Sequence, residues 1–406
     1  MFSNRKKNVL ILCILTYVMV YLCRLNFSAA VLKISESLEV STTAMGVVGS
    51  LFFISYALGQ LVNGFIGDRV SPTYFIMIAT IGTGLVNFMM SLVSNIWAIG
   101  FLWILNGYFQ SIFWGTCNRL LSYYYSGKEH HLISTGMSLS MVAGYVLSWA
   151  VLGKLLLESS WQSYFLVPAV VAAFMLCQWF FFAVLENGSR REDHPHSTLD
   201  MRSLMSTMNR ERLWLICCAC IFVGSVKESI GLWAPVIFLN ILGGDVNQSL
   251  LLIVVIPLGN LGGILLAEQL LRRPECNPYQ ILRNMLIAMI AFSLGIMMSR
   301  YISGLIAIFF TALVSGMALG CNSILLSFIP LSYSKQNIVA TLIGIFDFSA
   351  YLGAAFSAYV LGRFLDEGSW SVIPLFWAVS ALLALLLVLI RLRFYHKKGE
   401  MQNTAL

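Results

Sequence analysis

Long apolar runs alternate with short polar connections along almost the whole chain. Each run has about 20 residues or more, enough for an α-helix to cross a hydrocarbon core about 30 Å thick. Only the connection over residues 186–211 is both long and polar. The predicted spans are 8–32, 45–67, 74–94, 97–125, 133–157, 161–185, 212–240, 247–270, 279–300, 303–330, 337–364 and 370–391. This pattern predicts an all-α membrane protein with twelve transmembrane helices.

The order of the spans predicts two halves. Six spans precede the long connection and six follow it, giving an N-terminal half (1–185), a central loop (186–211) and a C-terminal half (212–406). Such a pattern favours two pseudo-symmetric halves, related by an axis along the membrane normal, with the ligand site near the midplane between them. A weak sequence similarity between the two halves agrees with this prediction, because Arg24 in the first span corresponds to Lys227 in the seventh. We therefore predict a two-halved secondary transporter that works by alternating access.

The composition also indicates a membrane protein. Of the 406 residues, 59% are hydrophobic and 11% are charged, and the mean hydropathy is +0.82. A soluble domain typically has about 25% charged residues. The first apolar run directly follows Arg5-Lys6-Lys7 and has no small-residue cleavage site, so we expect a retained signal anchor. The compact loops favour a bacterial inner membrane, and we expect a monomer.

The net charge of +7 could indicate a nucleic-acid partner, but the positions of the basic residues indicate membrane topology instead. Most basic residues fall at alternate ends of the spans, in the central loop and at the two termini. An excess of Lys and Arg on one side is typical of cytoplasmic loops. The basic positions on that side are Arg5, Lys6, Lys7, Arg69, Arg119, Lys128, Arg190, Arg191, Arg202, Arg210, Arg212, Arg272, Arg273, Lys335, Arg391, Arg393, Lys397 and Lys398. We expect both termini in the cytoplasm, the lipid bilayer as a partner and no nucleic-acid partner.

Metal, cofactor and enzyme chemistry find little support in the sequence. The nine cysteines lie almost all inside apolar spans, and the five histidines lie in predicted loops or the tail. Cys217-Cys218-Ala219-Cys220 has no nearby His, and its helical spacing does not bring the thiols together. We expect no metal, no cofactor and no enzymatic activity.

Four ionisable residues lie well inside predicted spans: Arg24, Lys227, Glu228 and Asp347. A charge at a helix centre costs about 2.5–3.5 kcal/mol on insertion scales, so each should face a cavity or a partner. Ion pairing between helices is the structural alternative to a substrate site. A guanidinium and an ammonium at matching depth in the two halves would suit phosphate, the first as a fork and the second as a point charge.

Two helix faces carry further candidates. Gly224 and Gly231 share a face with Lys227, either to leave space beside the ammonium or to pack helices closely. On the first span, the spacing i, i+4, i+7, i+11 defines one polar stripe. Its members are Tyr17, Tyr21, Arg24 and Ser28.

The two acids leave three interpretations open. An acid could neutralise a cation in the empty state, a protonated Asp347 could couple transport to H⁺, or the substrate could carry a positive group. Tyr351 follows Asp347 by one turn and joins the candidates. In the predicted loop after the second span, Asp68 and Arg69 could gate the closed state through charge contacts. An ordinary polar turn is the alternative there.

These residues resemble the major facilitator superfamily, and within it the organophosphate:phosphate antiporter family, which includes glycerol-3-phosphate, hexose-phosphate and glucose-6-phosphate transporters. The resemblance implies that Arg24 and Lys227 bind a phosphoryl group, with Tyr17 and Tyr21 beside them. Gln60 stands where the glycerol-3-phosphate type has Lys. The stretches that carry the resemblance are Tyr21–Ser28, Trp103–Gln110, Ser160–Ser163, and Phe222–Lys227 followed by Trp233.

Departures from that family limit the interpretation. The fourth-span motif reads Phe113-Trp-Gly-Thr-Cys-Asn118-Arg119 without its two prolines, and we keep Asn118 as a candidate substrate-binding residue. The fifth-span polar pair is Ser140-Met141, and Asp347 has no family counterpart. We expect a carrier of a small organic anion, most simply a phosphorylated metabolite, exchanged for phosphate or driven by H⁺. A carboxylate or sulfonate carrier and a membrane receptor for a sugar phosphate are the alternatives.

Overall fold

The computed structural model describes residues 2–67, 69–125, 130–186, 201–272, 277–299, 302–333 and 338–403, and this part of the chain is helical with short connections. Helices are expected because apolar side chains face lipid and every backbone polar group must then be satisfied within its own segment. The N-terminal half contains α1 (Phe2–Ser37), α2 (Thr42–Gly67), α3 (Pro72–Met90), α4 (Ile96–Gln110), α5 (Phe113–Tyr124), α6 (His130–Val146), a π-helical turn (Leu147–Leu152), α7 (Gly153–Leu155) and α8 (Ser163–Glu186).

The second half follows α9 (Met201–Arg210), a helix that lies inside the expected central loop. Residues 187–200 of that loop lie outside the described ranges. The second half contains α10 (Trp214–Ile241), α11 (Val246–Leu252), α12 (Val255–Leu271), α13 (Pro278–Ser299), α14 (Gly304–Ser323), a π-helical turn (Ile324–Phe328), α15 (Ile329–Leu331), α16 (Val339–Asp366), a 3₁₀ turn (Trp370–Val372) and α17 (Ile373–Asn403).

The predicted all-α membrane architecture is confirmed. Among the described residues, eleven helical segments are long and apolar enough to cross a membrane. At the predicted fifth span the helix runs from His130 to Leu155, and α6 passes through the π-helical turn into α7 within its apolar part, Leu139–Leu155. The predicted fourth span is also divided, since α4 ends at Gln110 and α5 begins at Phe113.

Local sequence signals explain several helix boundaries. Asn95 caps α4, with its side-chain oxygen accepting the Trp97 N–H at 2.8 Å, as expected for an N-cap residue. Pro72 begins α3, where a missing N–H costs nothing. Gly243 and Gly244 join α10 to α11 with φ of +66° and +94°, a conformation that favours glycine.

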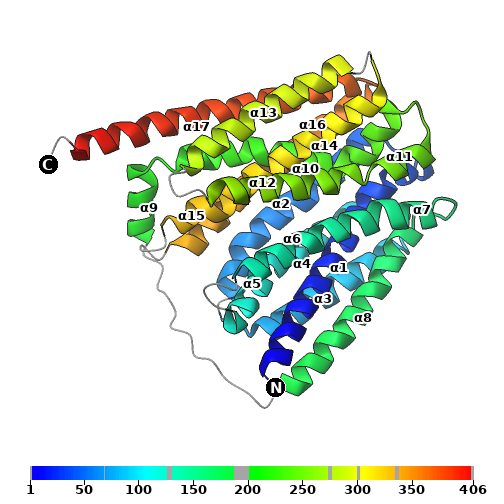
Figure 1. Cartoon of the computed structure of the whole chain (residues 1–406). Helices are drawn as coiled ribbons and strands as arrows, with labels where there is room; N and C mark the ends of the chain where they lie inside the picture. The colour runs from blue at the N-terminus through cyan, green and yellow to red at the C-terminus, as the bar shows by residue number, and fades with distance from the viewer. Residues whose placement is uncertain are drawn as a thin grey trace.

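The two ends of the helical bundle differ. Both termini, α5 and α9 lie at one end, which we call the terminal end, and α7 and α11 lie at the other, the distal end (Figure 1). The halves meet along α2 and α16, α1 and α10, and α6 and α12. In Figure 1 the ribbons of the two halves lie close together at the distal end and spread apart toward the terminal end.

Backbone-level contacts close the distal end. A Cβ on Gly46 would lie 2.6 Å from the Ala358 carbonyl oxygen, so α2 and α16 approach too closely for a larger residue. The Ser50 hydroxyl donates to the Ala355 carbonyl at 2.6 Å between the same two helices. Toward the terminal end, a Cβ on Gly64 of α2 would meet nothing within 4 Å. The structure is therefore a distal-closed state of the bundle.

Candidate functional site

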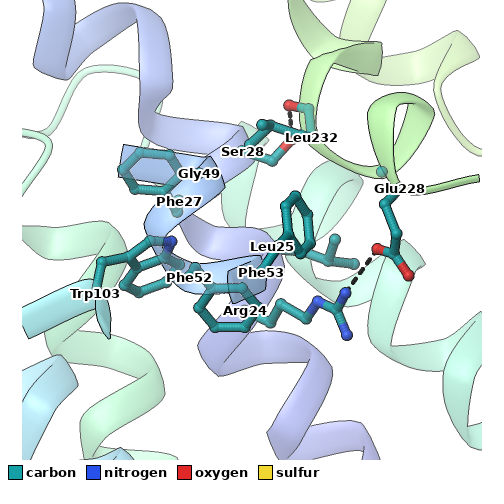
Figure 2. A pocket seen from close by; sticks show the side chains of 11 residues that line it. Arg24, Leu25, Phe27, Ser28, Gly49, Phe52, Phe53, Trp103, Glu228 and Leu232 are labelled. Carbon is teal, nitrogen blue, oxygen red and sulfur yellow. Dashed lines mark hydrogen bonds and ion pairs between the residues drawn. The ribbon is translucent and has the colours of Figure 1, made fainter. Parts of the chain in front are cut away.

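Arg24 lies near the middle of α1 and reaches across to the other half of the protein. Its Nη2 lies 2.6 Å from Glu228 Oε2 of α10, and its Nη1 donates to the Tyr351 hydroxyl of α16 at 3.1 Å. Figure 2 shows the guanidinium pointing from α1 toward the Glu228 carboxylate. Only 11% of the Arg24 side chain is exposed. Arg24 thus links the two halves through one ion pair and one hydrogen bond.

Glu228 pairs with a second cation as well. The Lys227 Nζ lies 2.8 Å from Glu228 Oε1, so each carboxylate oxygen faces a different cation. The Lys227 and Glu228 side chains are 15% and 9% exposed. Charges this deeply buried are tolerated when they are paired and hydrogen-bonded. The geometry thus pairs one acid, Glu228, with both cations, and the three interpretations of the acids stay predictions.

Aromatic rings surround the Arg24 guanidinium. Its Cζ lies 5.3–5.7 Å from the ring centroids of Phe52, Phe53, Tyr56 and Tyr351. A cation within about 6 Å of an aromatic face is attracted by the ring quadrupole. Phe52, Phe53 and Tyr56 are positions that the sequence analysis missed. Their spacing of i, i+1 and i+4 on α2 places them on one side of the helix, but that pattern is ordinary in an apolar span.

Asp347 lies beside this group rather than within it. Its Oδ2 accepts a hydrogen bond from Gln60 Nε2 of α2 at 2.9 Å, and the residue is 9% exposed. Asp347 precedes Tyr351 by one helical turn, so both face α2, where the Tyr56 and Tyr351 rings are tilted by 35° with centroids 4.2 Å apart. Gln60 therefore supplies a neutral partner to a buried acid and forms a further polar link between the halves.

The polar stripe of α1 continues toward the terminal end as an aromatic row. The Tyr21 ring lies 5.3 Å from that of Tyr145, and the Tyr17 ring lies 5.4 Å from that of Trp114. Asn118 donates to the Trp114 carbonyl at 2.8 Å, a bond within its own helix. The structure thus places Tyr21 one helical turn from Arg24 and Tyr17 beside Tyr21, with ring centroids 6.0 Å apart, whereas the amide of Asn118 is engaged one helical turn back on α5.

A small cavity adjoins Arg24 and Glu228 on the distal side. It has about 20 Å³ of space, enough for a water molecule but not for an organic anion. Ser28 closes it by donating to the Leu232 carbonyl at 2.6 Å, as the dashed line in Figure 2 shows. The lining residues are Arg24, Leu25, Phe27, Ser28, Gly49, Phe52, Phe53, Trp103, Glu228, Gly231 and Leu232.

The two glycines flanking Lys227 have different surroundings. A Cβ on Gly224 would lie 2.2 Å from the Ala350 carbonyl oxygen, so this glycine packs α10 against α16. A Cβ on Gly231 would lie 3.3 Å from the Tyr145 hydroxyl and 3.9 Å from Glu228 Oε2. Gly231 therefore leaves space beside the Glu228 carboxylate, and Gly224 is a packing residue.

The candidate gating loop is held by a residue outside the predicted pair. Asp68 lies outside the described residues, and Arg69 is exposed in the turn between α2 and α3. The guanidinium of Arg119 on α5 donates to the carbonyls of Gly67 and, at 3.2 Å, Val70. The sequence could have indicated this contact, because Arg119 is a basic residue at the end of the fourth predicted span.

Two six-helix halves that enclose a buried charged group define a polytopic membrane carrier of the alternating-access class. Residues 13–358 match the Major Facilitator Superfamily, and the chain belongs to this superfamily. Membership confirms the resemblance drawn from the sequence and the expected fold class.

Relatives extend the comparison over most of the chain. A probable hexose phosphate transport protein of Chlamydia trachomatis is 24% identical and covers 92% of this chain and 88% of its own length. The membrane sensor protein UhpC of Escherichia coli is 25% identical, with 94% and 91% covered. The crystal structure of the nucleoside transporter NupG superposes with a TM-score of 0.73 at 15% identity, covering 97% of this chain and 99% of that one. The last likeness concerns the fold alone.

Proposed function

We propose that this protein carries a small phosphorylated metabolite across a membrane by alternating access. The observation that supports the proposal most directly is the placement of Arg24 and Lys227, a guanidinium from one half and an ammonium from the other, around a shared carboxylate. A phosphoryl group carries the same kind of charge as that carboxylate and offers more acceptor oxygens. Similarity to a hexose phosphate transport protein agrees with this substrate class.

The cycle follows from the two-halved fold. The halves rock around a central anion held by Arg24 and Lys227, with Tyr17 and Tyr21 lining the approach from the terminal end. The basic residues at that end favour a cytoplasmic location for both termini, in a bacterial inner membrane. Phosphate is the proposed exchange partner, and H⁺ carried by Asp347 is the alternative coupling ion.

Liposome transport tests the proposal. Purified protein would be reconstituted in liposomes preloaded with unlabelled phosphate, and uptake of labelled phosphate would be followed with phosphorylated and carboxylated metabolites as competitors. We expect saturable exchange that sugar phosphates inhibit and that Arg24→Ala and Lys227→Ala both abolish. Inhibition by carboxylates or sulfonates, with none by phosphate esters, would instead favour an organic-anion carrier of that kind.

Similarity to the membrane sensor protein UhpC supports a second candidate, a receptor with a transporter fold. A receptor of this kind would bind phosphate esters at the same two cations without sustained flux. Binding of labelled phosphate to purified protein, together with no exchange in liposomes, would favour the receptor. Saturable exchange at many turnovers per molecule would rule out a pure receptor.

A further inference from the structure

Glu228 already occupies the position that an anionic substrate would need. One of its oxygens lies 2.6 Å from Arg24 Nη2 and the other 2.8 Å from Lys227 Nζ. The two cations belong to opposite halves, Arg24 to α1 and Lys227 to α10. Glu228 therefore forms within the protein the same bridge between halves that a bound phosphoryl group would form.

This bridge bears on the movement of the carrier without cargo. Closing the halves around two unpaired buried cations is costly, because the charges lose water and gain no partner. A bound anion removes that cost, and for this reason a site with cations alone favours exchange, in which the carrier rocks only when loaded. In the present structure the bundle is closed at its distal end, and both cations are paired with Glu228.

The surroundings of Glu228 also let its side chain move away. Gly231, one turn further along α10, has no side chain, and a Cβ there would lie 3.9 Å from Glu228 Oε2. The small cavity described above reaches Glu228 and Gly231. An incoming anion can thus displace the carboxylate toward this space and take over Arg24 and Lys227.

We propose that Glu228 is a built-in counter-anion that allows the empty carrier to close and return, so that the protein mediates net flux and not only exchange. This inference rests on the proposed function, because it requires that an anion binds at Arg24 and Lys227. It assigns to Glu228 the role of a competitor for the substrate, in addition to any part in holding α1 against α10. The two roles give opposite expectations for phosphate binding.

The first test compares two kinds of flux in the same liposomes. Exchange is measured with phosphate inside and outside, and net uptake with labelled phosphate outside only. For wild type we expect net uptake within about tenfold of exchange. For Glu228→Gln we expect the ratio of net uptake to exchange to fall at least about tenfold, since an unpaired buried cation pair is strongly disfavoured. Glu367→Gln is the matched control, because Glu367 pairs with Arg363, one turn away on the exposed end of α16.

The second test measures phosphate binding to purified protein by competition with labelled phosphate. Loss of an internal competitor should tighten apparent phosphate binding in Glu228→Gln by at least about tenfold, since the binding-competent fraction of the site rises. Asp347→Asn is the comparator, because it removes a buried negative charge that pairs with Gln60 rather than with either cation. We expect its effect on phosphate binding to be at least about threefold smaller than that of Glu228→Gln.

The outcomes separate the two levels of the argument. If wild type neither binds nor exchanges phosphate, the proposed function fails. If wild type exchanges phosphate but Glu228→Gln keeps the wild-type ratio of net uptake to exchange, the role of Glu228 is refuted and the proposed function stands. Weaker phosphate binding in Glu228→Gln would also refute the counter-anion role, because it would indicate a purely structural residue. Equally tightened phosphate binding in Asp347→Asn would refute it as well, because it would indicate a general effect of removing negative charge.

Discussion

Asp366 joins the two halves at the distal end and offers a direct test of what holds the bundle closed there. It is the last residue of α16, and its carboxylate meets the first turn of α2. One oxygen accepts the Thr42 N–H at 2.7 Å, and the other accepts the Thr43 N–H at 2.8 Å. The hydroxyl groups of Thr42 and Thr43 also donate to these oxygens. We call this set of contacts the distal latch.

The latch is an N-cap supplied by the other half of the protein. Replacing an N-cap acid by Ala costs about 0.5–2 kcal/mol, and the positive end of the helix dipole adds to the attraction of a carboxylate. Asp366 is exposed, so solvent screening keeps the total near 1–2 kcal/mol, which is about a 5- to 30-fold change in an equilibrium constant. Because donor and acceptor belong to different halves, the whole cost falls on the distal-closed state.

The assay is the rate at which a maleimide reagent labels a cysteine introduced at Ala355, which is 6% exposed between α2 and α16. The nine native cysteines would first be replaced. If labelling requires distal opening, Asp366→Ala should raise the rate by about 5- to 30-fold in proportion to the open population. Glu367→Gln should leave it unchanged. An unchanged rate in Asp366→Ala would show that the latch does not hold the distal end closed, and an equal rise in Glu367→Gln would indicate general loosening of α16.

Two further predictions concern packing and the anion site. Gly224→Ala should lower the melting temperature, because the new Cβ would lie 2.2 Å from the Ala350 carbonyl oxygen and overpacking costs about 1–3 kcal/mol. Gly64→Ala should not lower the melting temperature, because a Cβ there would meet nothing within 4 Å. Equal melting temperatures for the two variants would contradict this prediction. Arg24→Lys keeps the positive charge but loses the planar guanidinium and its hydrogen bond to Tyr351, so phosphate binding should weaken about 10- to 100-fold. Wild-type affinity of this variant in a phosphate-binding assay would show that the guanidinium does not bind the anion as a bidentate fork.

Much of the fold could be predicted because the membrane makes apolar length decisive. A helix must be about 20 residues long to cross, and the chain marks each span by that length. The same rule does not locate interruptions inside a span. The break between Gln110 and Phe113 and the π-helical turn at Leu147–Leu152 contain neither Pro nor Gly, so no helix-breaking residue marks them in the sequence.

The candidate site was predictable to the extent that charge inside an apolar span is rare and costly. That argument selected Arg24, Lys227, Glu228 and Asp347, and the structure brings the first three together. Which acid pairs with which cation could not be derived, because it depends on how α1, α10 and α16 are placed relative to one another. Spacing on one helix separates Lys227 from Glu228 by about 100°, yet the long side chains still meet at 2.8 Å.

The distal latch and the Glu228 bridge act on different parts of the conformational cycle. The latch joins α2 directly to α16 and uses none of the residues that would hold an anion, so it stabilises the distal-closed state equally with an empty or a loaded site. A ligand shifts a conformational equilibrium only by its differential affinity for the two states. Any dependence of closure on cargo must therefore arise at Arg24 and Lys227, where substrate and Glu228 compete. A carrier with the latch alone would rest closed whatever its cargo. The buried carboxylate is what makes the cost of closing similar with and without an anion.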